Sequence, residues 1–467
     1  MVANGRFLLP RDPDGAPATK PPLYNWLAAL SVGLLGLTSP LGHKLPAILA
    51  SFVTLFCVCF YARHLFTQHR QALGSSISWL GDQEAPRVLA LMAGMIWLAN
   101  LSTYKWIYIA RPDGIMITAM TLAWLSATYA LNPRCLKNKS AACLFWLSFT
   151  AVILSKGATA PIVLIYAILA AKIIHGKWSQ INRLYWWVGL PLSLIIVTAW
   201  ALPLHLKYPH HFIDVYWNKE IVHHTTGNLG PTRAILGFLK SLYLSPFYFL
   251  KAFLPWSVFV IYAMVRLFKN NRFKSLVQHP LAPALLWCVV QIILFCFVGK
   301  IKARYLAATY PAGAIIATYA LATLFSKKYQ LKRVTRDVAI TCLITVIGIS
   351  AFDWLSASNA TFAGKQEATR GDNLAAGQNV AQFAEQVKAI IGDDPVAFDV
   401  PGQSVIMALL GRHQGVNSPT PAMLKKAKWH IKIIDSQVGL VKTSELVTCI
   451  RNKQNKIFVK LGLYRLK

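Results

Sequence analysis

Long apolar runs, separated by short connections rich in lysine and arginine, are the feature that most restricts how this sequence can fold. A helix of about 20 apolar residues matches the hydrocarbon thickness of a bilayer. Such runs lie at about 45–63, 87–104, 113–131, 141–155, 159–176, 184–203, 252–268, 281–299, 305–325 and 337–354. A further run, Leu23 to Ser39, is interpreted as a helix lying along the interface. The pattern predicts a mainly α, polytopic helical membrane protein with about 10–11 membrane helices.

The composition supports this fold class and narrows the partners. Hydrophobic residues make up 55% of the chain and charged residues only 14%, while the net charge is +31 and the mean hydropathy is +0.45. These values exclude a disordered chain and argue against an ordinary cytosolic domain. The basic residues flank apolar runs instead of forming an arm, so we expect membrane lipids and phosphorylated lipids as anionic partners, and no nucleic acid. The eight cysteines show no metal or redox spacing.

The basic connections alternate along the chain and predict its orientation. Short connections with an excess of Lys and Arg face the cytoplasm. They contain Arg63, Arg70 and Arg87; Arg134, Lys137 and Lys139; Lys172, Lys177 and Arg183; Arg266, Lys269, Arg272 and Lys274; and Lys327, Lys328, Lys332, Arg333 and Arg336. The opposite connections hold the unusual polar motifs, which therefore share one non-cytoplasmic face.

The composition changes after the last apolar run and becomes that of an ordinary soluble segment. Helical periodicity covers 379–391, and strand-like pieces follow at 396–400, 429–434 and 457–460. We therefore expect three domains: 1–44, a periplasmic loop and interfacial helix; 45–354, the transmembrane domain; and 355–467, a small α/β domain. The span count places this C-terminal α/β domain on the face that carries the motifs.

Asp113 is the only acidic residue between Glu84 and Asp214. An ionisable group at a membrane boundary is a candidate functional residue. Pro112 prevents a simple helical continuation, so the acid is predicted at a helix entrance, where Arg111 would keep it ionised. Two interpretations stay open: a cap or first-turn acid favoured by the helix dipole, or a carboxylate that orients an acceptor or assists its deprotonation.

Two groups of cations lie on the same predicted face. Lys156 ends one apolar run and precedes another; it is either a snorkelling lysine or a contact for an anion. Lys300, Lys302 and Arg304, followed by Tyr305, form a second basic group at a span entrance. Their position opposes the positive-inside trend. A pyrophosphate or lipid phosphate bound through charge-assisted hydrogen bonds would account for it.

A polar loop between two apolar runs carries further candidates. It contains His210, His211, Asp214, Glu220, His223 and His224. His210 with Asp214, and Glu220 with His224, are i,i+4 pairs, so a divalent metal is one alternative, although no tight ligand motif is present. A polar, amphipathic helix facing the substrate is the favoured interpretation, and no cofactor is required. Asp12-Pro13-Asp14-Gly15 is interpreted as a turn.

Taken in order, these motifs resemble the GT-C superfamily of polyprenyl-phosphate-sugar-dependent glycosyltransferases. The likeness is greatest to the bacterial aminoarabinose (lipid A) transferase and protein O-mannosyltransferase-like group, over residues 1 to about 325. The matching motifs are Gly5-Arg6-Phe7-Leu8-Leu9-Pro10-Arg11, Lys20-Pro21-Pro22, Lys44-Leu45-Pro46, Arg111-Pro112-Asp113, Ser155-Lys156-Gly157, the His/Glu loop, Leu254-Pro255-Trp256, and Lys302 to Tyr305 before Tyr310-Pro311.

The resemblance implies an enzyme of the bacterial inner membrane, involved in lipid A or cell envelope glycosylation. It would move a hexose or pentose from a polyprenyl-phosphate donor to a lipid, glycan or protein acceptor on the periplasmic face. A carboxylate near the nucleophile and cations near the departing phosphate are then required. Asp113 would be the catalytic carboxylate, and Asp214, Glu220, His223 and His224 would line the substrate loop. The donor phosphate would contact Lys20, Arg111, Lys156, Lys300, Lys302, Arg304 and Tyr305.

The chain departs from the family pattern in two places. The family carries an additional first span and then an acidic pair, where its catalytic base is assigned; Met1 to Gly5 resembles the middle of that loop. The resemblance thus implies that Asp113 is a second carboxylate beside a base encoded upstream. Thr19 stands where the aminoarabinose transferases have an acid. Two alternatives remain: a truncated or inactive lipid-binding scaffold, and a transporter of a polyprenyl-linked substrate.

Overall fold

The described part of the chain divides into two compact units. Unit 1 comprises Met1–Ala18, Asn25–Leu45 and Ile347–Lys467, and unit 2 comprises Thr19–Tyr24 and Pro46–Val346. The computed structural model describes residues 7–10, 18, 20–36, 40–74, 77, 80, 83–100, 102–103, 111–214, 216, 218, 231–270, 273–297, 303–324, 333, 336–337, 339–340, 343–344, 346–348, 384–392, 394, 396–399, 429–433, 444–451 and 457–466.

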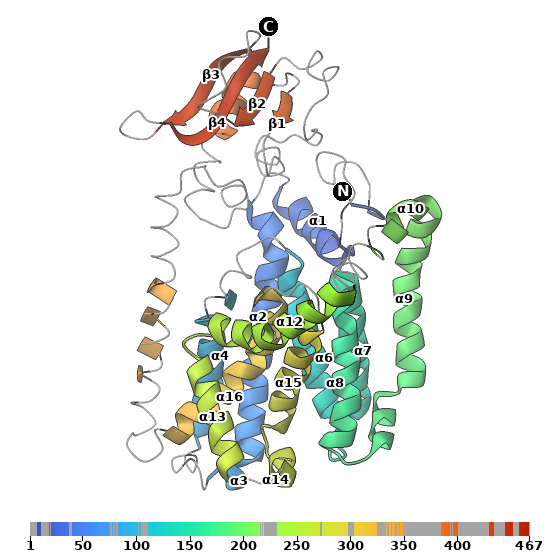
Figure 1. Ribbon diagram of the computed structural model, residues 1–467, viewed down its shortest axis with the longest axis vertical. Coiled ribbons are helices and arrows are strands. Elements are labelled where there is room, and N and C mark those ends of the chain that lie inside the picture. The colour runs from blue at the N-terminus through green and yellow to red at the C-terminus, as the bar shows by residue number, and fades with distance from the viewer. Residues whose placement is uncertain are drawn as a thin grey trace. The chain divides into compact units, whose positions relative to one another are not determined.

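Unit 2 is a bundle of helices, most of them running lengthwise in Figure 1. Apolar residues with few breakers form long helices that end where polar or proline-containing connections begin. The helices are α2 (Pro40–Gln68, which begins in unit 1), α3 (Arg70–Gly74), α4 (Ala85–Leu98), α6 (Asp113–Leu131), α7 (Asn138–Lys156), α8 (Ala160–Ile173), α9 (Trp186–Lys207), α10 (Pro209–His211), α12 (Pro231–Ala252), α13 (Ser257–Asn270), α14 (Phe273–Gln278), α15 (Ala282–Cys296) and α16 (Tyr310–Leu324). Short 3-10 segments η2 (Gly157–Thr159), η3 (Trp178–Leu184) and η5 (Ala303–Thr309) connect some of them.

Several of these helices have the length and apolarity needed to cross a membrane, as the sequence predicts. Among the described residues, five ranges pass: Leu41–Gln68, Asp113–Leu131, Asn138–Ile173, Trp186–Lys207 and Arg304–Leu324. Leu239–Ala252 and Ser257–Lys269 pass only as a pair, bent by 117°. Leu23–Leu35, Ala85–Leu98 and Ala282–Cys296 are shorter apolar helices. A mainly α, polytopic fold is confirmed, whereas the count of 10–11 spans stays a prediction.

The range Asn138–Ile173 contains a chain reversal. Lys156 leaves helical geometry at φ −162° and ψ 72°, and η2 separates α7 from α8. The Trp146 indole, on the first half of α7, donates to the carbonyl of Leu184, which follows α8 (2.6 Å). The chain has therefore returned to the start of α7 by residue 184. The sequence-based division into runs at 141–155 and 159–176 agrees with this reversal.

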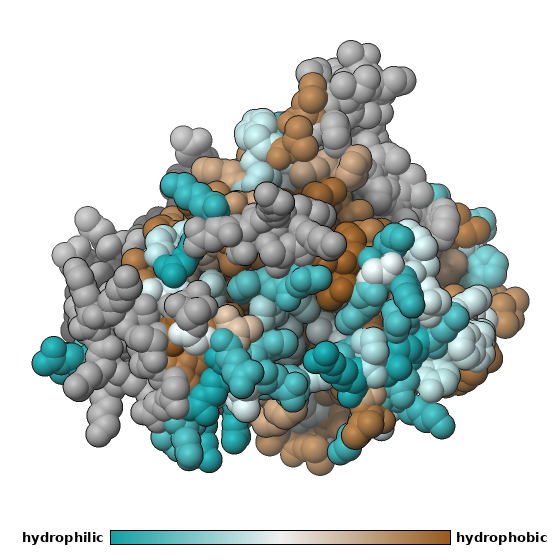
Figure 2. All heavy atoms as spheres, turned by 90° about the horizontal axis from the view of Figure 1, so that it is seen from below, coloured by the Kyte–Doolittle hydropathy of each residue, from teal (hydrophilic) through white to brown (hydrophobic). Residues whose placement is uncertain are grey.

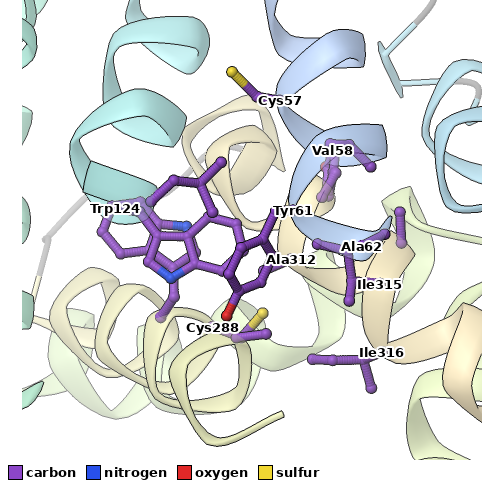
Figure 3. Close-up of a cluster of buried hydrophobic side chains, with 14 of the residues drawn as sticks. Cys57, Val58, Tyr61, Ala62, Trp124, Cys288, Ala312, Ile315 and Ile316 are labelled. Atoms are coloured by element: carbon purple, nitrogen blue, oxygen red, sulfur yellow. The ribbon is translucent and has the colours of Figure 1, made fainter. Parts of the chain in front are cut away.

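Aromatic rings from several helices form the centre of unit 2. The ring of Trp124 on α6 stacks on that of Trp287 on α15, with centroids 5.9 Å apart, and meets the edge of Tyr61 on α2 at 5.4 Å. Figure 3 shows Tyr61 and Trp124 with Cys288, Ala312 and Ile315 in this cluster. Burying such large rings contributes strongly to stability. The Trp287 N–H donates to the carbonyl of Ala308 (2.9 Å), so the core also anchors η5.

The two ends of the unit 2 bundle differ. Asp113 begins α6 and Leu131 ends it, so these residues mark opposite ends. At the Leu131 end, the Arg183 guanidinium donates to the carbonyls of Ala130 (2.9 Å) and Cys135 (3.2 Å). The Arg70 guanidinium donates to that of Leu80 (2.6 Å). Figure 2 views the end at which α3 and α14 lie, and hydrophilic side chains gather there.

Unit 1 contains helix α1 (Leu23–Leu35) and a mixed sheet. The strands are β1 (Val396–Asp399), β2 (Trp429–Ile433), β3 (Ser444–Arg451) and β4 (Ile457–Leu466). Their order is β1-β2-β4-β3; β1 pairs parallel with β2, and the other pairs are antiparallel. Residues 384–391 are helical. The structure thus has helix and strands near the positions expected from the sequence, and adds β3. The three expected domains and the periplasmic position of the last one stay predictions.

Candidate active site

The candidate site begins with an ion pair between two helix ends. The Lys156 ammonium, at the last position of α7, donates to a carboxylate oxygen of Asp113 at 2.9 Å. Asp113 is the first residue of α6, and Pro112 holds the cap position. Because α6 and α7 are antiparallel neighbours, the start of one meets the end of the other. The dipole of α6 favours the negative charge of Asp113 at its N-terminus, and the dipole of α7 favours the positive charge of Lys156 at its C-terminus.

This ion pair is largely buried. The side chains of Lys156 and Asp113 are 14% and 7% exposed. A charge at such a position requires a partner, since removing one member leaves the other desolvated and unpaired. The sequence places Asp113 correctly at a helix entrance, but its direct partner is Lys156 and not Arg111.

Tyr305 on η5 joins the pair to a second cation. The Lys156 ammonium lies 4.9 Å from the centroid of the Tyr305 ring, and the Arg304 guanidinium lies 5.7 Å from it. Phe295 of α15 stacks on the same ring, with centroids 5.8 Å apart. Cation–π contacts of this geometry hold both positive groups near the same aromatic ring. Tyr305 thus links two cations that the sequence separates by almost 150 positions.

The site carries more positive than negative charge. The positive charges of Lys156, Arg304 and Arg111 all act on the Asp113 carboxylate. The Nε atom of Arg304 is buried and has no hydrogen-bond partner among the described residues. Three cations around one carboxylate therefore leave a net positive site with a guanidinium N–H available, which fits an anionic group such as a phosphate.

A small cavity beside Gly114 is a feature that the sequence did not indicate. It has a volume of about 10 Å³, close to that of a single water molecule. Its lining includes Ser51, Thr54, Trp97, Thr103, Gly114, Ile117, Ala307 and Tyr310. The only sequence signal is a pair of hydroxyl residues, Ser51 and Thr54, three positions apart in an apolar run.

Close packing of α2 against α6 explains why a glycine follows Asp113. A Cβ atom at Gly114 would lie 3.3 Å from the Cβ of Ala47. One turn later, the Thr118 hydroxyl donates to the Ala50 carbonyl (2.6 Å) and meets the Thr54 hydroxyl at 2.7 Å. These contacts hold the first two turns of α6 against α2 and thereby position the Asp113 carboxylate.

Only some of the remaining predicted site residues belong to the part of the chain that the structure describes. The carbonyl of Lys20 accepts a hydrogen bond from the Tyr216 hydroxyl (3.1 Å), which ties the Lys-Pro-Pro motif to the polar loop. Asp214 is exposed, and its carboxylate accepts from the Asn218 amide (3.5 Å). Lys300, Lys302, Glu220, His223 and His224 lie outside the described residues.

The expected amphipathic helix over the polar loop is described only in part. α10 covers Pro209–His211, and π-helical geometry follows at residues 212–214, 216 and 218. Tyr216 is buried there, with its ring 5.4 Å from that of Trp200 on α9. Over the described residues, no group of three His, Cys, Asp or Glu side chains is placed to hold a metal ion.

Comparison with known proteins finds similarity to a curated relative in sequence and to solved structures in fold. No family model matches the chain. A curated protein of Shewanella sediminis, an undecaprenyl phosphate-alpha-4-amino-4-deoxy-L-arabinose arabinosyl transferase, is 23% identical over 337 residues. The match covers 71% of this chain and 55% of the relative, so the chain spans little more than half of that protein's length.

Two solved structures are similar over almost the whole chain. The crystal structure of ArnT from Cupriavidus metallidurans bound to undecaprenyl phosphate has a TM-score of 0.68 at 14% identity, covering 99% of this chain and 91% of that one. The apo state of the same protein gives 0.64 at 14% identity, with 99% and 90% covered. At this identity the likeness concerns the fold. The chain therefore has the polytopic helical fold of ArnT.

Proposed function

We propose that this protein is a membrane glycosyltransferase that moves a sugar from a polyprenyl-phosphate donor to an envelope lipid, glycan or protein. The net positive site around Asp113 carries the proposal. It combines a carboxylate, which the acceptor requires, with cations that the departing phosphate requires. The related fold was crystallised with undecaprenyl phosphate, and the curated relative is an arabinosyl transferase that uses an undecaprenyl-phosphate-linked sugar.

In the proposed reaction, the cations and the carboxylate of the site have different roles. The acceptor hydroxyl attacks the anomeric carbon of the sugar, and the bond from that carbon to the phosphate oxygen breaks. The polyprenyl phosphate leaves with the electron pair, and the acceptor proton passes to a base. Lys156, Arg304 and Arg111 would stabilise the charge that develops on the phosphate, while Asp113 would orient the acceptor hydroxyl.

The remaining assignments are part of the same proposal. Lys20, Lys300 and Lys302 would extend the phosphate contact, and Tyr305 would hold Lys156 and Arg304 in place. Asp214, Glu220, His223 and His224 would line the acceptor path. We place the protein in the bacterial inner membrane, with the motif face and the C-terminal α/β domain in the periplasm.

A transfer assay with a matched pair of variants tests the proposal. Purified protein is given undecaprenyl-phosphate-linked sugars, 4-amino-4-deoxy-L-arabinose among them, with lipid A and other envelope acceptors. We expect Asp113→Asn to lower transfer about 100-fold, because a reacting group that is no longer correctly oriented can cost that much in rate. Because the same change leaves Lys156 without its carboxylate partner and should lower stability, transfer is compared at equal amounts of folded protein. Glu84→Gln, the same carboxylate-to-amide change in an exposed ion pair with Arg87, serves as the control.

The products distinguish this function from the alternatives. Free undecaprenyl phosphate together with a glycosylated acceptor supports the transferase. Movement of the intact donor across vesicles without sugar release would instead show a transporter. Binding of the donor without either event would show a lipid-binding scaffold. Full transfer by Asp113→Asn would remove Asp113 from the mechanism.

A further inference from the structure

Helix α12 exposes a continuous apolar stripe. The side chains of Leu239, Leu242, Tyr243 and Phe247 are 51%, 52%, 60% and 52% exposed. Their spacing places them on one side of the helix. The opposite side carries Ser241 and Ser245, which are buried. Ser245 donates to the carbonyl of Ile292 on α15 (2.9 Å), so this inner side is already packed against the bundle.

The direction of α12 differs from that of the other long helices. Leu239–Ala252 is bent by 117° from Ser257–Lys269; 0° would be a straight continuation and 180° a return. Figure 1 shows α12 running across the bundle, while α13 runs lengthwise. Asn100 and Ser102 both donate to the carbonyl of Ala252 (2.9 and 3.1 Å). These bonds hold the end of α12 at the bend.

Two lysines mark one edge of the exposed stripe. Lys240 and Lys251 are both exposed. Eleven residues correspond to about three helical turns, so the two ammonium groups lie on the same edge. A helix that crosses the hydrocarbon core would bury at least one such charge at a high cost. A helix that lies in the interface can keep both in the headgroup layer, with its apolar side chains below.

Helix α13 exposes apolar side chains as well. After the bend, α13 exposes Val258, Ile261, Val265 and Phe268, along a helix that forms part of the membrane bundle. An in-plane α12 would place its stripe at the border of the hydrocarbon-facing surface and its lysine edge in the headgroup layer. Positive charge at this border matches the negative phosphates of anionic lipids.

We propose that α12 is an in-plane helix at the membrane surface and that Lys240 and Lys251 bind the headgroups of anionic phospholipids. Because α12 contacts η5, which carries Arg304 and Tyr305, this surface borders the candidate active site. The inference does not rest on the proposed sugar transfer. It requires only the membrane fold and the geometry of α12.

The depth of two labelled positions tests the in-plane orientation. Leu239→Cys and Phe247→Cys are spin-labelled in the full chain, with the native cysteines replaced, and their depth is measured in bilayers. In an upright helix, eight residues would separate the labels by about 12 Å in depth. We expect about 5 Å or less. Val258→Cys and Val265→Cys on α13 calibrate the method with an expected separation of about 10 Å. A separation near 12 Å on α12 would overturn the proposal.

Local lipid preference tests the lysine edge. A fluorophore at Tyr243→Cys is quenched by phosphatidylglycerol or by phosphatidylcholine, each carrying a headgroup spin label. We expect phosphatidylglycerol to quench more strongly and Lys240→Gln/Lys251→Gln to reduce that preference by about fivefold or more. Lys240→Arg/Lys251→Arg should preserve it. An unchanged preference in the glutamine variant, or its loss in the arginine variant, would contradict headgroup binding by these charges.

Discussion

The two ends of the unit 2 bundle are both rich in cations, but their cations have different partners. At the Leu131 end, Arg183 donates to two backbone carbonyls. At the Asp113 end, Lys156 contacts a carboxylate and an aromatic ring, and Arg304 keeps a buried N–H without a partner among the described residues. Backbone carbonyls satisfy the first group as part of the fold. The cations at the Asp113 end can still bind an anion. The two ends therefore differ in the hydrogen-bond partners of their cations and not in the number of positive charges.

The largest expected effect concerns the buried pair. Asp113→Asn or Lys156→Met alone should lower the free energy of unfolding by roughly 3–5 kcal/mol. The first change leaves the Lys156 ammonium buried without its carboxylate, and the second leaves the Asp113 carboxylate buried without its ammonium. The double variant should recover most of this loss. Thermal unfolding of the three variants in detergent measures the coupling. Additive losses would mean that the two side chains do not act as a pair.

Protonation at the opposite end should have the next largest effect. Burial, and then the positive charge of His69, lower the pKa of His279 to about 4. Its Nδ1 accepts a hydrogen bond from the backbone N–H of Leu281 (3.2 Å), which requires the unprotonated nitrogen. The unfolded chain therefore takes up the proton first. The free energy of unfolding should fall as the pH decreases from about 6.5 to about 4, by up to roughly 3 kcal/mol.

Substitution of His279 itself is the control for this pH dependence. His279→Gln should flatten the pH dependence over that interval while leaving sugar transfer at neutral pH unchanged. Unfolding curves between about pH 4 and pH 7.5 measure the difference between variant and wild type. Equal slopes in the two proteins would assign the pH dependence to other groups.

Much of the fold follows from the sequence because hydrocarbon allows few alternatives. The run at 113–131 is α6 (Asp113–Leu131), and the runs at 141–155 and 159–176 lie in α7 and α8. Backbone groups in a bilayer must bond within their own helix, so apolar length largely determines these elements. The run at 252–268 was less accurate, since α12 continues to Ala252 and α13 begins at Ser257 after the bend.

The sequence indicated several residues of the candidate site but not the contacts between them. The sequence indicated Asp113, Lys156 and Arg304, since each is a charge at the end of an apolar run. It could not show that Lys156 replaces Arg111 as the direct partner, because that contact depends on the antiparallel packing of α6 and α7. Phe295 behind the Tyr305 ring was missed for the same reason: an aromatic residue in an apolar run carries no signal of its neighbours.

Binding of undecaprenyl phosphate to the full chain tests the contrast between the two ends most directly. Lys156→Gln and Arg304→Gln each remove a charge at the candidate site, and Arg183→Gln removes one at the opposite end. We predict that the first two weaken equilibrium binding about tenfold or more, as expected for a lost charge-assisted hydrogen bond, while Arg183→Gln changes it less than about twofold. Equal binding by all three variants would contradict the assignment of the Asp113 end as the phosphate site.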